Sequence, residues 1–324
     1  MYHVSNNWQP TATLKNLELR AKLNAKIRDF FKERNTLEVE TPLLSLSTNP
    51  AVHLNSFKTS FCLPGKTCGQ DFYLQTSPEF AMKRLLAANN VDIYQICKAF
   101  RNSEIGRMHN PEFTILEWYR IGFDHLKLMD EVSLFLKNIF AVKDVKYLSY
   151  QKVFEEFLEI NPHTSSIVEL KAIAHKRNLE VIGSVDSLDA WRELLFTHLI
   201  EPNLAPQSPV FIYDFPSSQA MLAKIKPGNP PLAARFEVYF KGVELANGFH
   251  ELNSAKEQRE RFLQDLRLRK EANLPTIPID ENFLVALPNL PDCAGIAFGL
   301  DRLLMLLSEA NSLAEVISFT IENA

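Results

Sequence analysis

The feature that most constrains the fold of this chain is the uneven spacing of its strand-like stretches. Apolar or alternating runs at 91–100, 113–121 and 210–215 are separated by helical patterns of very different length. A doubly wound parallel sheet would need crossover helices at regular intervals, and this pattern does not provide them. The sequence therefore predicts an α+β fold, in which helices flank an antiparallel sheet.

Length and composition fit one large domain over residues 1–324, with a mainly helical insertion at about 145–205. The chain has 324 residues, 46% of them apolar, and a formal net charge of −4. Its Lys and Arg residues form no block, so binding of a large RNA is not expected. The four cysteines show no paired C-x2-C spacing, which argues against structural zinc and disulfides. No signal peptide and no apolar run of about 18 residues is present, so we expect a cytoplasmic protein without membrane attachment.

A strand predicted at 113–119 carries the first group of candidate binding residues. Period-two alternation places an aromatic ring, a carboxylate and a phenol on one face, in the set Phe113, Ile115, Glu117 and Tyr119. The opposite face, which we expect to point into the core, carries Thr114, Leu116 and Trp118. The alternative interpretation is a half-exposed strand with ordinary polar residues.

A β-hairpin is predicted at 236–249, because Lys241 and Gly242 can supply the positive φ angles of a tight turn. With that turn, residue 239 stands opposite 244, and residue 237 stands opposite 246. One face then carries Glu237, Tyr239, Glu244 and Ala246. Two carboxylates this close repel unless a cation lies between them, and oxygen ligands suit magnesium. The alternative is two solvated surface glutamates.

Two glycines are expected to shape the chain near a ligand. Gly248 is expected to mark a β-bulge that re-aims Glu251. Gly299 lies at a strand-to-helix junction, where Arg302 in the first helical turn can meet a phosphate. The alternative for this segment is a helix-start acid, Asp301, beside a surface arginine. A glycine-rich phosphate loop is absent from the sequence, so any nucleotide must bind in another way.

These segments together resemble the three signature motifs of class II aminoacyl-tRNA synthetases, and specifically those of the lysyl branch. Pro42, after the first long helix, resembles motif 1; residues 100–114 resemble motif 2; and residues 299–302 resemble motif 3. Residues 244–251 are similar to the lysyl-type strand that precedes motif 3. The resemblance covers residues 14–320 and implies the class II catalytic fold.

Within this class, the chain is similar to the elongation factor P (R)-β-lysine ligase family. A lysyl-tRNA synthetase would carry an anticodon-binding OB-fold of about a hundred residues before the catalytic core, and here we expect only a short leader. The resemblance implies ATP and Mg²⁺ as cofactors, β-lysine or lysine as the small substrate, and a lysine side chain of elongation factor P as the acceptor. It also implies a homodimer formed through residues 14–44, and it disfavours tRNA. The alternatives are a truncated lysyl-tRNA synthetase that charges tRNA, and an inactive synthetase-like regulatory module.

The resemblance implies a role for each nucleotide-binding residue. Arg101 would stabilise charge at the α-phosphate and Arg302 would bind the γ-phosphate of a bent ATP, which makes these two the catalytic candidates. Phe113 would stack on adenine. Further nucleotide contacts are expected from Asn102, Ser103, His109, Asn110, Glu244, Leu245 and Gly299. Magnesium would be held by Glu237 and Glu244.

The amino-acid side of the site is expected to be acidic, because the two ammonium groups of a diamine need charged partners. Glu251 is expected to bind the distal amine. Ala297 stands where lysyl-tRNA synthetases tend to have glycine, and its methyl group would reshape the pocket in favour of a β-amino acid. The expected contacts are Ser77, Pro78, Glu79, Glu117, Tyr119, Asn247, Glu251 and Ala297.

One position departs from the family pattern. The pattern has Arg-x-Glu, and the third position here is Ser103, followed by Glu104. If the loop shifts by one residue, Glu104 substitutes for the missing carboxylate. Otherwise we expect weaker binding of ATP.

Overall fold

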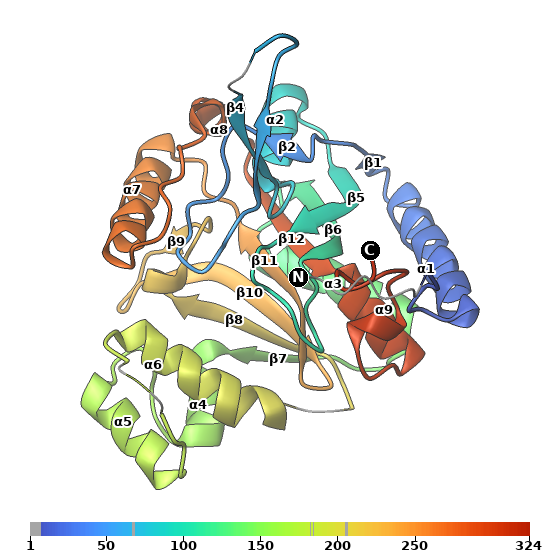
Figure 1. Cartoon of the computed structure of the whole chain (residues 1–324). Helices are drawn as coiled ribbons and strands as arrows, with labels where there is room; N and C mark the ends of the chain where they lie inside the picture. The colour runs from blue at the N-terminus through green and yellow to red at the C-terminus, as the bar shows by residue number, and fades with distance from the viewer. Residues whose placement is uncertain (1–7, 67–68, 182, 184, 205–206) are drawn as a thin grey trace. The chain divides into compact units, whose positions relative to one another are not determined.

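The structure is a computed structural model that describes residues 8–66, 69–181, 183, 185–204 and 207–324. The chain folds into two compact units. Unit 1 is built mainly from the two ends of the chain, blue and red in Figure 1, and comprises Met1–Gly122, Leu252–Cys293 and Ala297–Ala324. Unit 2 is built mainly from the middle of the chain and comprises Phe123–Glu251 and Ala294–Ile296.

The strands of unit 1 form two sets of pairings. In the first set, β1 (Leu37–Glu38) pairs in parallel with β5 (Ile93–Phe100), and β5 pairs antiparallel with β6 (Glu112–Ile121). In the second set, β4 (Gln70–Leu74) lies between β2 (Leu44–Ser45) and β3 (Lys58–Phe61). A further strand, β12 (Cys293–Gly299), begins and ends in unit 1, while its central residues belong to unit 2.

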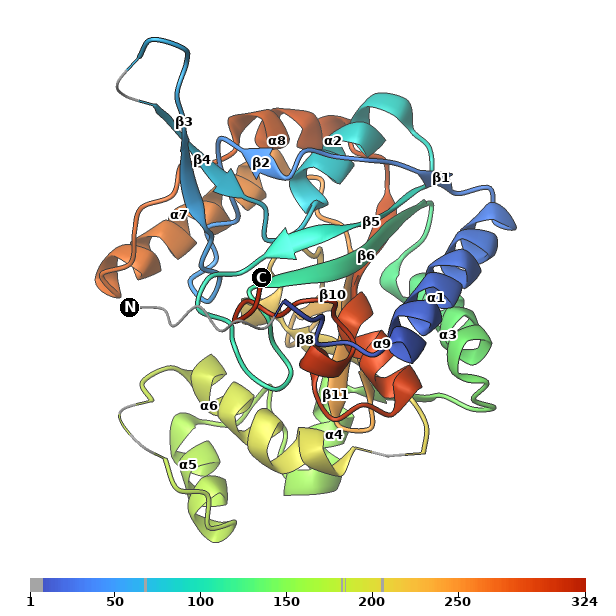
Figure 2. The same ribbon diagram turned by 45° about the vertical axis from the view of Figure 1, so that its right-hand side comes forward.

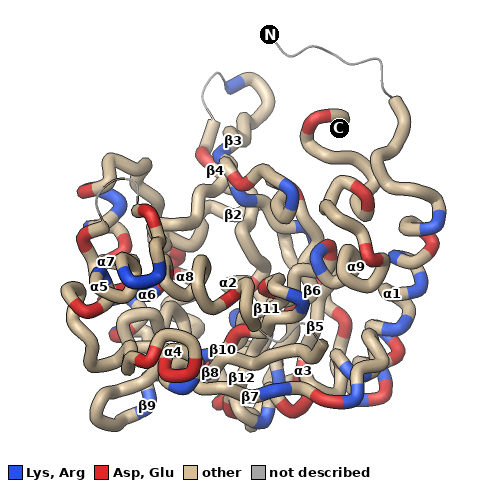
Figure 3. The backbone as a smooth tube through the Cα atoms, turned by 90° about the horizontal axis from the view of Figure 1, so that it is seen from below, with Lys and Arg blue, Asp and Glu red and all other residues tan. Residues whose placement is uncertain are grey.

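The helices of unit 1 are held by capping and by aromatic packing. Helix α1 (Leu14–Lys32) begins where the Thr13 hydroxyl accepts a hydrogen bond from the amide of Asn16, and Phe31 stacks on Tyr94 with ring centroids 4.3 Å apart. Charges of both signs alternate along α1 in Figure 3, as expected of a solvated helix face. Figures 1 and 2 show α2 beside α8. The remaining helical elements are α2 (Glu79–Asn89), α7 (Ala255–Glu271), α8 (Glu281–Ala286), α9 (Leu300–Ser308), η4 (Leu287–Asn289) and η5 (Leu313–Glu315).

The strands of unit 2 follow one another across a mixed sheet. Strand β10 (Leu232–Phe240) pairs antiparallel with β11 (Val243–His250), β8 (Val210–Pro216) and β9 (Ile225–Lys226). Strand β7 (Lys146–Ser149) pairs in parallel with β8. Helix α3 (His125–Phe140) packs on β10 and β11.

A helical segment follows β7 and has its own aromatic core. It consists of α4 (Tyr150–Leu158), α5 (Ile167–Lys176), α6 (Leu188–Leu195), the π-helical turn η1 (Phe196–Ile200) and the 3-10 turn η2 (Glu201–Asn203). Its buried side chains, among them Tyr150, Phe154, Trp191 and Phe196, share one cluster with Phe215 of β8. A short 3-10 turn, η3 (Ser217–Gln219), comes directly after β8.

The α+β prediction is confirmed, with one correction of detail. A mixed arrangement of strands replaces the antiparallel sheet that was predicted, because β1 and β7 each pair in parallel with a neighbour. The segment 145–205 opens with strand β7, and its helices follow. Among the described helices, none is long and apolar enough to cross a membrane.

Unit 2 contains a charged cluster that sequence analysis did not identify. Asp214 of β8 accepts hydrogen bonds from the Lys226 ammonium at 2.6 and 2.7 Å and lies 3.2 Å from Nε2 of the buried His125. Its backbone has a φ of 63°, a strained value for a residue other than glycine. Burial opposes ionisation of Asp214, but the hydrogen bonds from His125 and Lys226 outweigh it and lower the pKa of the carboxyl group. The cluster thus joins α3, β8 and β9.

We expect Asp214→Asn to lower the free energy of unfolding by about 1.5–3 kcal/mol at neutral pH, because Lys226 and His125 lose the carboxylate that they contact. A carboxyl group with a lowered folded-state pKa stabilises above its unfolded pKa of about 3.9, and that contribution is lost as the pH falls through the folded value. The difference between the wild type and Asp214→Asn should therefore shrink below about pH 4. Urea unfolding at pH 7 and pH 3 measures both effects, and an equal difference at the two pH values would contradict the role given to the cluster.

Candidate active site

One group of candidate residues lies on strand β6 in unit 1. The Tyr119 hydroxyl donates to Oε1 of Glu117 at 2.6 Å, so the predicted shared face is confirmed, and both residues are buried. Trp118 is buried on the other face, where its ring stacks with Phe298 at 5.9 Å. The register with β5 places Gln95 opposite Glu117 and extends this face with a residue that sequence analysis missed.

The face is acidic enough to affect a neighbouring thiol. Burial, aided by the charge of Glu117, raises the pKa of Cys97 to about 12, against a hydrogen bond from Gln75. Cys97 therefore stays protonated at neutral pH. The described cysteines, Cys62, Cys97 and Cys293, form no disulfide, and Cys68 lies outside the described residues.

The loop between β5 and β6 brings a cation next to an aromatic ring. The Cζ atom of Arg101 lies 5.1 Å from the centre of the Phe113 ring, an arrangement that suits a phosphate beside a stacked base. Ser103 has a φ of 70°, and the turn at this residue brings a Glu104 carboxylate oxygen to 3.8 Å from the Arg101 guanidinium. Glu104 thus supplies a carboxylate to Arg101 from one residue after Ser103, the position where the family pattern has glutamate. The backbone amide of Asn102 bonds the carbonyl of Asn55 and fixes the start of this loop.

The start of α9 presents the second arginine to the same loop. The Arg302 guanidinium donates to the carbonyl of Met108 at 3.3 Å and lies 2.7 Å from Nε2 of His109. This geometry requires Nε2 of His109 to accept, which leaves its proton on Nδ1. Arg302 is half-buried and bonded to the loop, which fixes its side chain beside His109, and its contact with a phosphate stays a prediction.

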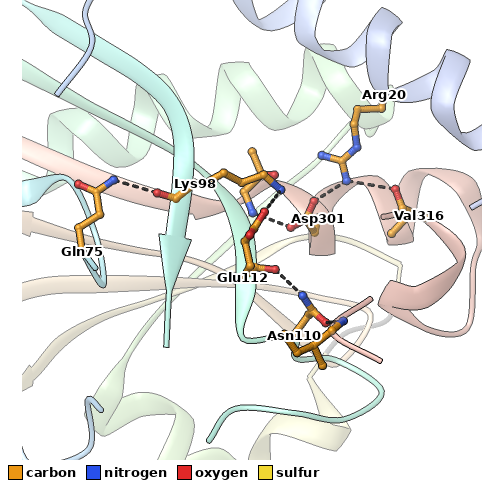
Figure 4. Close-up of polar contacts among 9 residues, drawn as sticks. Arg20, Gln75, Lys98, Asn110, Glu112, Asp301 and Val316 are labelled. Atoms are coloured by element: carbon orange, nitrogen blue, oxygen red, sulfur yellow. Dashed lines mark hydrogen bonds and ion pairs between the residues drawn. The ribbon is translucent and has the colours of Figure 1, made fainter. Parts of the chain in front are cut away.

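Neighbouring side chains hold this arrangement in place. The buried Asp301 carboxylate accepts from the Arg20 guanidinium (Figure 4). It also accepts, at 2.6 Å, from the backbone amide of Thr114. Asn110 donates to the carbonyl of Glu112 at 2.6 Å and accepts from the amide of Ile321 at 3.1 Å. The nucleotide contact expected of Asn110 stays a prediction, and its visible role is to join the loop to the C-terminal segment. Gly299 occupies the N-cap of α9 without a side chain in the way.

A cavity of about 250 Å³ opens in unit 1 beside three of the predicted substrate contacts. Ser77, Pro78 and Glu79 line it, together with residues of β2, β4 and α8. The Ser77 hydroxyl accepts from the amide of Glu79 at 3.2 Å, and α2 begins at Glu79. The Glu79 carboxylate already holds the buried ammonium of Lys83 at 2.7 Å. Because Lys83 offsets this charge, Glu79 is a weaker partner for a substrate ammonium than the sequence suggests.

Unit 2 carries a second group of candidate residues on its hairpin, where one predicted pairing is correct and one is wrong. Lys241 and Gly242 have φ values of 52° and 71°, as the predicted turn requires, and Tyr239 stands opposite Glu244. The register then shifts, so that Glu237 faces Asn247 and not Ala246, which pairs with Val238. The cause is one extra residue on β11, a β-bulge at Leu245, whose own side chain is buried. The bulge places Asn247 on the face that carries Glu237.

Glu237 is a buried carboxylate with two protein partners. Arg235 forms an ion pair with Oε1, and the Tyr239 hydroxyl donates to Oε2 at 2.6 Å. Burial raises the pKa of Glu237 to about 7, and the charge of Glu244 adds to this rise, while Arg235 and Tyr239 oppose it. Because Glu244 stands opposite Tyr239, two residues along the strand from Glu237, the hairpin places both carboxylates on one face.

A pair of carboxylates is a donor set that suits magnesium better than a metal ion held by protein side chains alone. Among the residues that the structure describes, no three His, Cys, Asp or Glu side chains gather as a metal cluster. Magnesium commonly takes one or two carboxylates and completes its shell with water and phosphate oxygens. The donor set of Glu237 and Glu244 therefore suits magnesium bound together with a nucleotide.

Gly248 is needed for close packing and does not mark a bulge, contrary to the sequence prediction. It pairs in register with Phe236 on β10. A Cβ atom at this position would stand 2.5 Å from two atoms of the Phe236 ring. Glu251 lies just after β11, is buried, and forms an isolated antiparallel β-bridge with Ala223. Ala297 is half-buried near the end of β12.

The structure adds Arg235, Gln95 and Lys83 to the residues that sequence analysis assigned to the site. The signal for Arg235 was present, because it stands two residues before Glu237 and so on the same face of a strand. The signal for Gln95 required the β5–β6 register, and that for Lys83 required knowing that this lysine is buried within α2.

This fold, with its paired arginines and buried carboxylates, is that of a synthetase-type enzyme, and the comparison with known proteins agrees. Residues 7–323 match the family model for class II tRNA synthetases (D, K and N), and the chain belongs to this family. It is an ATP-dependent ligase, and members of the class use ATP and Mg²⁺ in general. It is 49% identical over 319 residues, 98% of either chain, to proteins named elongation factor P–(R)-beta-lysine ligase from Salmonella paratyphi B, Salmonella dublin and Salmonella heidelberg.

We expect Gly248→Ala to lower the free energy of unfolding by about 1–3 kcal/mol, because the added methyl group meets the Phe236 ring. Phe236→Leu would make room for that methyl group. The double variant should therefore lose less stability than the sum of the two single losses. Denaturant unfolding of the four proteins measures this, and purely additive losses would show that the ring is not the obstacle.

Proposed function

We propose that this chain activates (R)-β-lysine as its aminoacyl-adenylate and transfers it to a lysine side chain of elongation factor P. The observation that carries the proposal is the 49% identity to ligases of that name, which extends over 98% of both chains. The buried glutamates support it, because a substrate with two ammonium groups needs anionic partners. Residues 1–324 act as one catalytic domain, and the protein works in the cytoplasm.

Activation depends on position and charge, with no covalent enzyme intermediate. The substrate carboxylate attacks the α-phosphorus of ATP, and pyrophosphate leaves. Arg101 stabilises the charge that develops on the α-phosphate, and Arg302, held by the loop of His109, binds the γ-phosphate. Phe113 stacks on the adenine. Glu237 and Glu244 would hold magnesium, which when bound would supply positive charge to the phosphates.

Transfer then forms an amide. The neutral amine of the acceptor lysine attacks the carbonyl carbon of the adenylate, the amine loses a proton, and AMP leaves. In the substrate site, Glu251 binds the distal ammonium, while Glu117, with Tyr119, binds the other. Asn247 completes the polar contacts, and the methyl group of Ala297 favours the displaced amine of a β-amino acid.

Two observations favour this proposal over a tRNA-charging synthetase and an inactive module, and a third supports the homodimer. The net charge of −4 and the lack of a Lys or Arg block disfavour tRNA, whose binding depends on phosphate contacts. Both arginines are present and Glu104 lies beside Arg101, which argues against an inactive module. Exposed apolar side chains in the segment 14–44, namely Leu14, Leu37, Leu43 and Leu44, suit the homodimer that we propose for this segment.

The acceptor is tested by incubating the protein with ATP, magnesium and (R)-β-lysine, once with elongation factor P and once with lysine-specific tRNA. We expect mass spectrometry to find one added β-lysyl group on the factor and lysine to be the poorer donor. An unmodified factor beside efficiently charged tRNA would overturn the proposal in favour of a truncated lysyl-tRNA synthetase.

Glu244→Gln tests the magnesium site. We expect the rate of ATP–pyrophosphate exchange to fall by about 10–100-fold and the required magnesium concentration to rise, because one carboxylate ligand is lost. Thermal stability should not fall, since the substitution removes a charge that repels Glu237. Glu156→Gln, an exposed change in the same unit, is the matched control. An unchanged magnesium dependence in Glu244→Gln would exclude this residue as a ligand.

A further inference from the structure

Arg235 occupies the centre of a polar network in unit 2 that the proposed mechanism leaves without a role. Its Nε donates to Oδ1 of Asn247 at 3.2 Å, and its Nη1 donates to the backbone carbonyl of Gln219 at 3.1 Å. Its Nη2 forms the ion pair with Glu237. The Cζ atom lies 4.5 Å from the centre of the Phe215 ring, and the residue as a whole is 9% exposed. A guanidinium is rigid and planar, so these acceptors are fixed relative to one another.

We propose that Arg235 is a positioning residue, whose guanidinium fixes the orientation of both the Glu237 carboxylate and the Asn247 amide. The helical segment of unit 2 holds this guanidinium in place through Asp189. The proposal rests on the proposed function, because it takes Glu237 as a magnesium ligand and Asn247 as a substrate contact.

The hydrogen bond to Asn247 decides which end of its amide faces a ligand. Arg235 has only donors, so the oxygen of the amide must point toward it. The two N–H groups of Asn247 then point elsewhere and can donate to an oxygen of the substrate. Without Arg235, the amide is free to turn over and present its oxygen, which accepts no bond from a carboxylate.

The contacts of Glu237 fix the carboxylate without using all of its acceptor capacity. Arg235 holds Oε1, and the Tyr239 hydroxyl holds Oε2 at 2.6 Å, so the group cannot rotate without breaking both bonds. Two carboxylate oxygens together offer about four lone-pair sites, which leaves room for a cation. Outer hydrogen bonds of this kind orient the ligands of a metal ion.

The helical segment supports Arg235 from behind. Asp189 of α6 accepts from Arg192 at 2.8 Å, from the Ser218 hydroxyl at 2.9 Å and from the Gln219 side chain at 3.4 Å. These bonds hold turn η3, whose Gln219 carbonyl receives Arg235. The same segment packs Tyr150 on Phe215, with ring centroids 4.8 Å apart, and Phe196 on Tyr239 at 5.5 Å. The helical segment thus stabilises the positions of Arg235 and Tyr239, the two residues that bond Glu237.

The test uses the full chain with four variants: Arg235→Gln, Arg235→Lys, Asp189→Asn, and Glu169→Gln as control. Glu169 is also a carboxylate at the start of a helix of the same segment, but it bonds only the Ser166 that caps α5. Calorimetry measures the affinity for (R)-β-lysine alone, which reports on Asn247, and the magnesium dependence of ATP binding, which reports on Glu237. Thermal unfolding of each variant separates loss of folding from loss of positioning.

We expect Arg235→Gln to weaken both affinities by about 10–100-fold, as for other outer-shell residues. Arg235→Lys keeps the charge but not the three directed donors, so its losses should be intermediate. Asp189→Asn should weaken both affinities by about fivefold, the effect of roughly 1 kcal/mol. Glu169→Gln should alter neither affinity, whatever it does to the melting temperature.

Unchanged affinities in Arg235→Gln, with a lowered melting temperature, would overturn the proposal and leave Arg235 a purely structural role. A change in only one of the two affinities would also overturn it, because a single guanidinium could not then be setting both groups. If Arg235→Gln does not fold, Arg235→Lys and Asp189→Asn decide by the same two readouts. Wild-type protein that binds both ligands but adds nothing to elongation factor P would refute the proposed function without touching Arg235.

Discussion

The buried carboxylate of Asp301 is the contact on which the arrangement of unit 1 depends. It accepts from Arg20 of α1 and from the amide of Thr114 on β6, while the helix that carries it begins one residue earlier. Arg20 also donates to the carbonyl of Val316 (Figure 4). Asp301 and Arg20 together therefore join helix α1, strand β6 and the C-terminal segment. A buried charge without its partner costs several kcal/mol, so these elements stay together or come apart together. Arg302 is the next residue of that helix, and Phe113 precedes Thr114, so the contact also sets two of the proposed nucleotide-binding residues.

The two units handle a buried glutamate in the same way. Tyr119 donates to Glu117 and Tyr239 donates to Glu237, each over 2.6 Å and each from two positions further along a strand. Residues two apart on a strand share a face, so the hydroxyl needs no other element to reach the carboxylate. Burial raises the pKa of Tyr239 well above its usual value, so this hydroxyl remains a donor at neutral pH. In each pair the hydroxyl satisfies one oxygen of a buried carboxyl group, and the remaining lone pairs can still accept a ligand.

Residue patterns predicted well what lies within one strand or one turn, and less well what lies between strands. The face shared by Glu117 and Tyr119 and the turn at Lys241 follow from local geometry, and both are confirmed. The pairing of Glu237 with Ala246 is wrong because a bulge adds one residue to β11, and alternation alone cannot locate such a bulge. The same shift brought Asn247 to the face of Glu237. The assigned ligands of the individual residues stay predictions.

The sequence by itself determined the α+β class, the family and the order of its motifs, because periodicity and local residue types act over short distances along the chain. Only the tertiary structure decided which charges are already compensated. Lys83 offsets Glu79, Arg235 offsets Glu237, and Glu104 reaches Arg101 across a turn at Ser103. The physical reason is that the energy of a charge depends on its burial and on the groups within a few ångströms of it. The partners in these pairs stand only two to four residues apart in the chain, but the burial of Lys83 and Glu237 comes from packing that a linear pattern does not encode.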